Sequence, residues 1–544
     1  MLSSNAAHKA FCPTKDGERK LKNGRTPILN EHPRPTMVRS DHTMLNGFWD
    51  YAIVSIPESD NGSKWRKSTT VLTRDEAVQA VKEAAIPETF DGKILVPFSP
   101  ESALSGVHQT IYPDNMIWYR TIVHPVTLGG EEAVRQIGDA NRLILHFEAV
   151  DYVCACFING QFAGVHVGGY LPFDVDISAF VDPDDAFEIA LCVYDPNDSG
   201  MQMRGKQKIE REYLVHRTKR HLAERVDGDR AGGVHADAHA EGLCGRQTVH
   251  SRGNRRRQAE RQTAYRRNGP ADGTIVADER FAAGMRKVRT EIATRAEHLW
   301  SPEDPYLYDV TATLEFGAAK SQEKQDIVRS YCAFRTVEIK PDLKGVARFH
   351  LNGKPLFLKG VLDQGYWPDG LLTAPSDEAL IHDIIAMKKS GFNMLRKHIK
   401  IETARWYYHC DRLGMLVWQD AVSGGGEYNA WTTNRKPTLV RATWNKYRDD
   451  TAKHFAALGA DDSTYRRDWS RTCDAMVHML AGHPSIVAWV LFNEGWGQFN
   501  ACDAAERIHA LDPTRPIDAT SGWYDQRCGD FHSVHNYFRP LEIY

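Results

Sequence analysis

Polar side chains recur directly after short apolar segments in the C-terminal third of the sequence. These side chains are Asp363, Arg396, His398, Asn493, Glu494, His535 and Tyr537. If the apolar segments are parallel strands, their carboxyl ends share one rim and the side chains converge there. A carboxylic acid that protonates a leaving oxygen, surrounded by hydrogen-bonding groups, suits the cleavage of a glycosidic bond. The same chemistry needs a second carboxylate on the other side of the anomeric carbon.

The C-terminal part, 339–544, alternates apolar strand patterns with helical patterns. Strands are expected at 356–364, 392–398, 415–422, 486–494, 517–522 and 531–537, and helices at 377–391, 401–414, 464–480 and 501–512. Repeated strand–helix units with nearly continuous apolar strands predict a parallel sheet that is covered on both faces. A (β/α)8 barrel and an open doubly wound sheet both satisfy this pattern. The sequence contains no GxGxxG or GxxxxGKS/T phosphate loop, which argues against a nucleotide-binding sheet.

Short strand patterns separated by turn residues dominate residues 25–210, which follow an N-terminal tail of residues 1–24. Asn159-Gly160 separates two of these patterns, and the dipeptide favours a type I′ hairpin because both turn positions need a positive φ. Strand after strand with turn signals predicts an antiparallel β-sandwich.

A second β-sandwich is expected over 211–338, but its first part has an unusual composition. Residues 213–270 contain no Ile, Phe, Trp or Met, whereas Arg occurs twelve times. A segment of this kind cannot build a core, and its composition predicts disorder. Three interpretations stand side by side: a basic nucleic-acid-binding insert, a solvated linker, and a segment translated out of frame. We prefer the third, because one permitted codon choice for 213–229, read one nucleotide later, gives IWYTEQSGIWQSVWMET.

Composition and charge exclude several classes of protein. The 544 residues suggest three or four domains, and a net charge of −3 argues against an overall binder of nucleic acid or membrane surfaces. No segment approaches the ~20 apolar residues that span a bilayer, and the N-terminus has no apolar signal-peptide core. Ten cysteines are scattered without a CxxC pair, so we expect reduced thiols, a cytoplasmic protein, and neither a bound metal nor another cofactor.

Three segments resemble glycoside hydrolase family 2. HPSIVAWVLFNEGWG (483–497) is similar to the acid/base signature of the family, in which an Asn-Glu pair closes the fourth barrel strand. FINGQFAGVHVGGYLPFDVDIS (157–178) resembles its sugar-binding jelly roll, and HLWSPEDPYLYDVTATLEF (298–316) its immunoglobulin-like domain. The out-of-frame SGIWQSVW resembles the junction between those two domains. The resemblance implies a jelly-roll sandwich, an immunoglobulin-like sandwich and an incomplete (β/α)8 TIM barrel, and the activity of a retaining exo-β-glycosidase of the β-galactosidase or β-glucuronidase type.

The resemblance also assigns roles to the rim residues. It makes Glu494 the acid/base, with a pKa raised by an ionised nucleophile nearby, and Asn493 a partner of the sugar 2-hydroxyl. Tyr537 resembles the tyrosine that hydrogen-bonds the nucleophile. His398 follows Arg396 by two residues where the family has three, so it is either a sugar contact or a structural rim histidine, and Arg396 is either a substrate contact or a partner of barrel carboxylates. Asp363, His535 and Trp496 complete the expected substrate-binding set.

The nucleophile of the family is a glutamate at the end of strand seven, in a Glu-Phe/Tyr-Gly context. Nothing before Tyr544 fits, and Glu542 follows the expected sixth strand too closely. We therefore expect that the gene continues and that this chain alone is inactive. The expected partner is a β-glycoside, with no nucleic acid and no membrane, and a homo-oligomer remains open. The alternatives are a carbohydrate-binding protein without catalysis, which uses the first sandwich, and a nucleic-acid binder, which uses the Arg-rich stretch.

Overall fold

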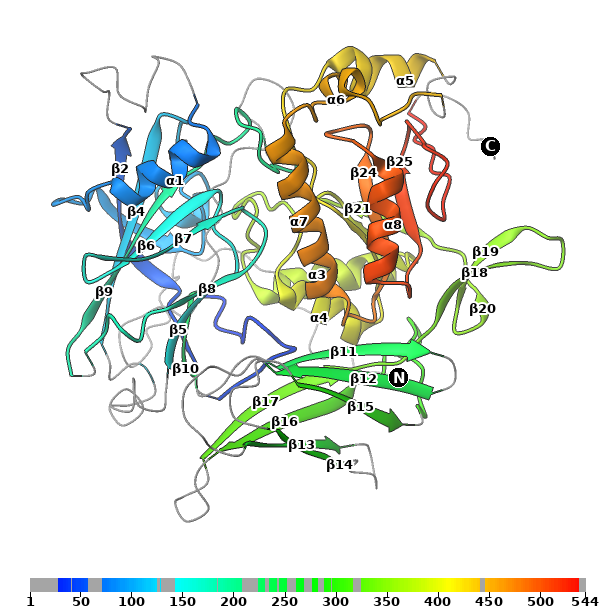
Figure 1. The fold of residues 1–544 in the computed structure, drawn as a ribbon, viewed down its shortest axis with the longest axis horizontal. Coiled ribbons are helices and arrows are strands. Elements are labelled where there is room, and N and C mark those ends of the chain that lie inside the picture. Colours follow the sequence, from blue (N-terminus) through cyan, green and yellow to red (C-terminus); the bar gives the residue numbers. More distant parts are fainter. Residues whose placement is uncertain are drawn as a thin grey trace.

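A computed structural model describes residues 28–537 of the chain, with gaps. The gaps are residues 41, 57–70, 125–127, 129–141, 183, 208–223, 230–233, 242–243, 252–260, 269–275, 282–287, 295, 317–323 and 441–445. Between 224 and 294, and next to the gap at 317–323, only the backbone course of the strands is described. Figure 1 shows a sandwich at the left, a second sandwich below, and a layer of helices and parallel strands at the upper right.

The first sandwich consists of two antiparallel sheets. One contains β1 (His42–Met44), β10 (Glu224–Asp229), β5 (Arg142–Phe147) and β8 (Phe173–Asp176), in that order. The other contains β3 (Gly92–Val96), β2 (Gly47–Ser55), β4 (Asn115–Val123), β9 (Phe187–Tyr194), β6 (Val153–Ile158) and β7 (Gln161–Val167). Ile94, Leu145 and Leu191 belong to the core between the sheets, whereas helix α1 (Arg74–Glu83) covers the other face of the larger sheet. The predicted hairpin is confirmed, since Asn159 and Gly160 connect β6 to β7 with φ of 49° and 77°.

The second sandwich also has two sheets. They contain β11 (Val234–Glu241), β12 (Cys244–Ser251) and β15 (Val288–Thr294), and β14 (Val276–Phe281), β13 (Arg261–Asn268), β16 (Tyr308–Phe316) and β17 (Lys324–Cys332). Strands β10 to β13 lie within 213–270, the segment that the sequence predicts to be scrambled or disordered, and that prediction stays untested. Antiparallel pairing uses main-chain groups that nearly every residue supplies, so strands form here despite the polar composition. β10 pairs in the first sandwich although it lies beyond residue 210. The reading-frame interpretation stays a prediction.

The third part begins with a small antiparallel sheet and continues as a parallel one. The small sheet contains β18 (Val337–Pro341), β19 (Ala347–Leu351) and β20 (Lys354–Pro355). The parallel sheet contains β21 (Gly360–Asp363), β22 (Met394–Lys397), β23 (Leu416–Asp420), β24 (Ile486–Asn493) and β25 (Ile517–Ser521). Its strands follow one another in chain order. A doubly wound sheet reverses its strand order, so the sequential order matches a barrel and decides between the two predicted architectures.

Helices connect the parallel strands as predicted. They are α3 (Asp377–Lys389), α4 (Ala404–Leu413), α7 (Ser463–Leu480) and α8 (Ala501–Leu511), and the long β23–α7 connection adds η3 (Trp431–Arg435), α5 (Lys436–Leu439) and α6 (Ala452–Ala457). All eight residues of β24 are buried, as expected for a central strand with covered faces. In the described part of the chain, no helix has the length and apolar character needed to cross a bilayer.

The sixth predicted strand, 531–537, is wrong, because this segment is not a strand in the structure. It runs beside β25 but makes only scattered main-chain bonds to it, from Asp530 N to the Ile517 carbonyl and from His535 N to the Gly522 carbonyl. Side chains replace the other bonds of a ladder: the Asp530 carboxylate accepts from Ile517 N at 2.8 Å, and Ser533 donates to Asp518 at 2.5 Å. Local side-chain bonding of this kind competes with regular strand pairing.

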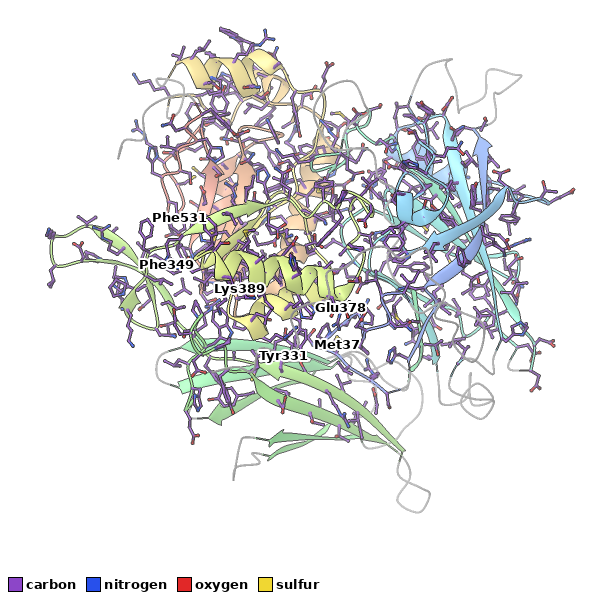
Figure 2. All side chains as sticks on the ribbon, turned by 180° about the vertical axis from the view of Figure 1, so that it is seen from behind. Met37, Tyr331, Phe349, Glu378, Lys389 and Phe531 are labelled. Carbon is purple, nitrogen blue, oxygen red and sulfur yellow. The ribbon has the colours of Figure 1, made fainter. Side chains whose placement is uncertain are left out.

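Side-chain hydrogen bonds and a β-bridge connect both sandwiches to the barrel. Tyr331 on β17 donates to Asp411 at 2.7 Å, and it lies at the junction between the second sandwich and the helices α3 and α4 (Figure 2). Arg74 at the start of α1 donates to both carboxylate oxygens of Asp468 on α7, each at 2.9 Å. The loop after β9 pairs with the loop after β23 through Met203. The first sandwich therefore contacts both the outer helices and the strand-end loops of the barrel.

Candidate active site

Glu494 lies at the point where the chain leaves β24. Its φ of 52° is in the left-handed region that non-glycine residues seldom adopt, and Gly495 follows at 74°. Its main-chain N–H donates to the carbonyl of Ser521 at 2.9 Å, which fixes the turn to the end of β25. The side chain is only 7% exposed. A strained backbone and a buried carboxyl at a strand end are typical of functional positions in barrels.

Two donors hold the Glu494 carboxylate, and both act on Oε1. His535 Nδ1 lies 2.8 Å away, and the Tyr537 hydroxyl donates to the same oxygen. His535 Nε2 faces Ser521 Oγ at 3.1 Å and an Arg396 nitrogen at 3.5 Å. Because arginine can only donate, Nε2 is the acceptor and Nδ1 carries the proton given to Glu494.

These contacts favour the ionised form of Glu494. Burial raises the pKa of this carboxyl, but the hydrogen bonds from His535 and Tyr537 and the positive charge of Lys206 outweigh burial, so the pKa lies below its usual value. A raised pKa was predicted for a site that also holds an ionised nucleophile. In the described residues the pKa of Glu494 is lowered instead, because the groups around it are hydrogen-bond donors and cations rather than a second carboxylate.

Arg396 on β22 organises the rest of the rim. It donates to both oxygens of Asp420 at 2.9 Å, to Ser521 Oγ at 2.8 Å and to Asn493 Oδ1 at 3.1 Å. The bidentate pair with a buried aspartate favours the positioning role that the sequence left open for Arg396. Since the Asn493 oxygen is taken by Arg396, the orientation of the Asn493 amide is fixed.

His398 lies beside this arrangement and is 4% exposed. Burial lowers its pKa far below the usual range, and the positive charges of Arg396 and Lys206 act in the same direction, so the ring is neutral. Among the described residues its Nδ1 has no hydrogen-bond partner. That nitrogen is itself buried, so the neutral ring does not present it to solvent at the rim.

Lys206 is a rim residue that the sequence did not reveal. It comes from the loop after β9, in which Gly205 N donates to Ser423 O at 2.9 Å and Arg204 to Gly426 O at 3.0 Å. The ammonium lies 4.6 Å from the ring centre of Trp496, a cation–π distance. Burial lowers the pKa of Lys206, and the charge of Glu494 opposes that shift. Spacing could not indicate this residue, because it reaches the rim from another domain.

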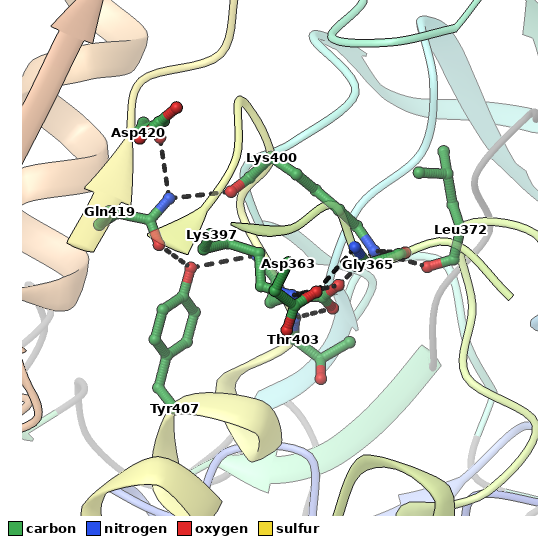
Figure 3. A network of polar contacts seen from close by, with 10 residues as sticks. Asp363, Gly365, Leu372, Lys397, Lys400, Thr403, Tyr407, Gln419 and Asp420 are labelled. Atoms are coloured by element: carbon green, nitrogen blue, oxygen red, sulfur yellow. Dashed lines mark hydrogen bonds and ion pairs between the residues drawn. The ribbon is translucent and has the colours of Figure 1, made fainter. Parts of the chain in front are cut away.

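Asp363 does not join the other predicted residues. Lys397 lies 2.8 Å from its Oδ1, and Gly365 N donates to the same atom at 2.9 Å. Figure 3 shows Asp363 close to Lys397 and Gly365, in a set of contacts that we call the buried lysine network and that reaches the main chain of Asp420 through Gln419. Its charged members are Asp363, Lys397, Lys400 and Glu402. The remaining predicted residues form what we call the rim cluster: Glu494, Asn493, Arg396, His398, His535 and Tyr537, with Trp496 and Lys206 at its edge.

Among the described residues, the rim cluster holds one carboxyl at a strand end, Glu494, with two others nearby. Asp420 pairs with Arg396 through both oxygens, whereas Asp518 lies fully buried within β25 and accepts from Ser533 through one oxygen only. In the described part of the chain, no group of three His, Cys, Asp or Glu side chains is placed to hold a metal ion. The arrangement suits proton transfer and the binding of hydroxyl groups.

Two β-sandwiches followed by a β/α barrel with a buried glutamate at its strand ends define a multidomain barrel protein. Three family models match the chain in the same order. The sugar binding domain of glycosyl hydrolases family 2 matches 114–212, a further family 2 model matches 242–335, and the family 2 TIM barrel domain matches 342–539. The chain belongs to glycoside hydrolase family 2, and the predicted fold class is confirmed.

Similar proteins cover different parts of the chain. A β-galactosidase of Enterobacter cloacae is 25% identical over 516 residues, which are 88% of this chain and 42% of that protein. A β-galactosidase of Yersinia enterocolitica is 30% identical over 262 residues, 47% of this chain and 21% of that protein. The β-D-glucuronidase structure of Dictyoglomus thermophilum superposes with a TM-score of 0.59 at 16% identity and covers 89% of this chain and 73% of that one. The chain spans less than half the length of these two β-galactosidases.

Proposed function

We propose that the protein hydrolyses β-glycosides with retention of configuration, as an exo-acting enzyme of the β-galactosidase or β-glucuronidase type. The observation that carries this proposal is the buried Glu494 carboxyl at the end of β24, held by His535 and Tyr537 within a rim of hydrogen-bonding groups. Relatives named β-galactosidase and fold neighbours named β-glucuronidase support the class of substrate. The chemistry is a double displacement in which one carboxyl serves as acid and then as base.

Glu494 is the acid/base in this proposal. In the second displacement it acts as a base and takes a proton from the attacking water, and its lowered pKa in this chain keeps it in the ionised form that this step requires. In the first displacement it must carry a proton for the leaving oxygen. An ionised nucleophile close to Glu494 would raise its pKa and supply that protonated state.

Three neighbours position the sugar. Asn493 presents its amide N–H groups to the sugar 2-hydroxyl, because its oxygen already accepts from Arg396. His398, a neutral ring beside Arg396, contacts a second hydroxyl once the rim side chains adjust to the sugar. Trp496, half-buried and two residues after Glu494, contributes an aromatic edge to the sugar site, because Tyr428 stacks on its ring and Lys206 lies over it. These contacts favour a pyranose held with its glycosidic oxygen at Glu494.

We further infer that residues 1–544 alone do not complete the reaction. Among the described residues, the other carboxyls near the rim are Asp420 and Asp518. Arg396 holds both oxygens of Asp420, and Asp518 is fully buried and accepts from Ser533, which argues against either as the nucleophile. Without a nucleophile, acid/base help from Glu494 cannot form a glycosyl-enzyme.

The test is hydrolysis of 4-nitrophenyl β-galactoside and β-glucuronide, with the first anomer released identified by proton NMR. It compares residues 1–544 with the complete product of their gene, whichever residues that product includes. We expect no hydrolysis by residues 1–544 alone, and retention of configuration wherever hydrolysis occurs. Glu494→Gln should suppress it, whereas the control Glu506→Gln, at an exposed position of α8, should not.

The outcomes separate the alternatives. Hydrolysis by residues 1–544 that depends on Glu494 would mean that the nucleophile lies within them. Release of the inverted anomer would contradict the double displacement. Sugar binding without hydrolysis by either chain would favour a carbohydrate-binding protein.

A further inference from the structure

A cavity of about 630 Å³ lies between the first sandwich and the barrel. Its walls come from the start of α1, from the loop after β9 and from one face of α7. Figure 1 shows α7 as the barrel helix that faces the first sandwich. The lining includes none of the rim cluster, so the cavity is separate from the Glu494 site.

Polar groups from both domains converge in this cavity. The charges of Asp468 and Arg74 both act on the pKa of the Tyr152 hydroxyl, and Arg74 donates to Asp468 at 2.9 Å. Arg471, one helical turn beyond Asp468 on α7, acts on the same carboxylate. All four residues line the cavity. They present donors and acceptors side by side, and neither sandwich nor barrel holds the complete set.

The cavity wall also contains a buried acceptor that is not satisfied. Gln202 is 6% exposed, and within the described structure its Oε1 has no hydrogen-bond partner. The side-chain amide of Gln202 fills the space that a Cβ at Gly200 would take, and its nitrogen donates to the Asn197 carbonyl. The oxygen is covered, so a ligand hydroxyl contacts it only when the Gln202 side chain turns toward the cavity, and that contact would offset the roughly 1–3 kcal/mol cost of an unsatisfied buried acceptor.

The balance of charges and the apolar lining indicate the class of ligand. Two arginines are opposed by three aspartates (Asp75, Asp462 and Asp468), so the walls do not select an anion. Leu72, Met201 and Ala475 add apolar surface. The volume is within the range of about 300–1,000 Å³ of small-molecule sites. We propose that this cavity is a second carbohydrate site, which binds a neutral sugar by its hydroxyls and its C–H face.

The experiment is hydrogen–deuterium exchange with methyl β-D-galactopyranoside and methyl β-D-glucopyranoside as probes. We expect slower exchange in 71–75, 199–203 and 462–475, in the wild type and equally in Glu494→Gln, which separates this site from the rim. Ala475→Leu should abolish the protection by filling the cavity. The control His478→Leu adds the same side chain at an exposed position of α7 outside the lining and should keep it.

A second variant protects the test against a folding defect. Asp468→Asn keeps the shape of the side chain but loses the charged acceptor, and it should weaken sugar binding by about tenfold, as expected for one lost hydrogen bond to a charged group. The thermal midpoint of each variant shows whether it folds. The proposal is overturned if neither sugar protects these segments, if Ala475→Leu and Asp468→Asn leave the protection unchanged, or if inorganic phosphate protects them and the sugars do not.

Discussion

Two polar networks lie on opposite faces of strand β22 and differ in how completely they are paired. Arg396 enters the rim cluster, and its neighbour Lys397 enters the buried lysine network, because successive side chains of a strand point to opposite faces. In the lysine network Lys397 is paired with Asp363 and Glu402, and Lys400 donates to Glu402 and to the Leu372 carbonyl at 3.0 Å. The ammonium of Lys397 also lies 4.1 Å from the ring centre of Trp406.

The rim cluster is less completely hydrogen-bonded than the lysine network. The Nδ1 of His398 has no partner among the described residues, and Glu494 carries a left-handed backbone. Complete pairing fits a network that stabilises the barrel, whereas a buried nitrogen without a partner and local backbone strain fit a network that has a functional role. Although both networks contain buried lysine or arginine side chains paired with carboxylates, the lysine network has the features of a structural network and the rim cluster those of a functional site.

The largest expected effect is on the stability of the lysine network. Glu402→Gln should destabilise the barrel by about 3–5 kcal/mol, because it leaves Lys397 and Lys400 short of a buried counter-charge. Urea unfolding followed by tryptophan fluorescence measures this. Glu494→Gln is the matched control and should cost about 1 kcal/mol or less, since Gln still accepts from Tyr537. Equal losses in the two variants would mean that both networks are structural.

An intermediate effect is expected on the ionisation of Glu494. Tyr537→Phe removes a hydrogen bond to the carboxylate and should raise its pKa, as measured by carbon-13 NMR titration. Tyr51→Phe, in β2 of the first sandwich, is the control. Because the folded-state pKa of Glu494 lies below the unfolded one, its ionised form stabilises the fold above the unfolded pKa, and this contribution is lost as the pH falls through the folded pKa. Tyr537→Phe should therefore reduce the loss of stability on acidification. An unchanged titration of Glu494 in this variant would mean that Tyr537 does not lower its pKa.

The smallest effect concerns Lys206. Lys206→Met should also raise the pKa of Glu494, but less than Tyr537→Phe, because Lys206 acts through its charge and not through a hydrogen bond to the carboxylate. Lys206→Arg keeps the charge and should leave the titration nearly unchanged. A shift of the same size in both variants would point to a displaced loop rather than to the charge. Raised salt should shrink the Lys206→Met effect only slightly, since the pair is partly buried.

Much of the fold could be predicted because it depends on local patterns. The apolar run before Glu494 predicts β24, and Asn159-Gly160 predicts the β6–β7 turn, since both signals lie in adjacent residues. The segment 531–537 has a strand-like pattern, but bonds from Asp530 and Ser533 replace strand pairing, and periodicity does not detect such bonds.

The sequence could predict only those site residues that directly follow an apolar strand pattern. The pattern places Asn493, Glu494 and Arg396 at strand ends but does not say which face each side chain takes, and so Asp363 was expected at the rim rather than beside Lys397. Lys206 reaches Trp496 across a domain boundary, and the neutral state of His398 depends on burial and on two cations from separate segments. Properties that arise from packing between distant segments have no local signal in the sequence.

The central claim is that Glu494 is the acid/base and not the nucleophile, although its lowered pKa and its contact with Tyr537 would suit either role. The most direct test is the leaving-group dependence of Glu494→Gln in the complete product of the gene. For an acid/base, the variant should lose roughly 10²–10⁴-fold with an alkyl β-glycoside, which needs protonation to depart, and far less in the glycosylation step with an activated aryl β-glycoside. Equal loss with both leaving groups, without rescue by azide, would contradict the account and make Glu494 the nucleophile.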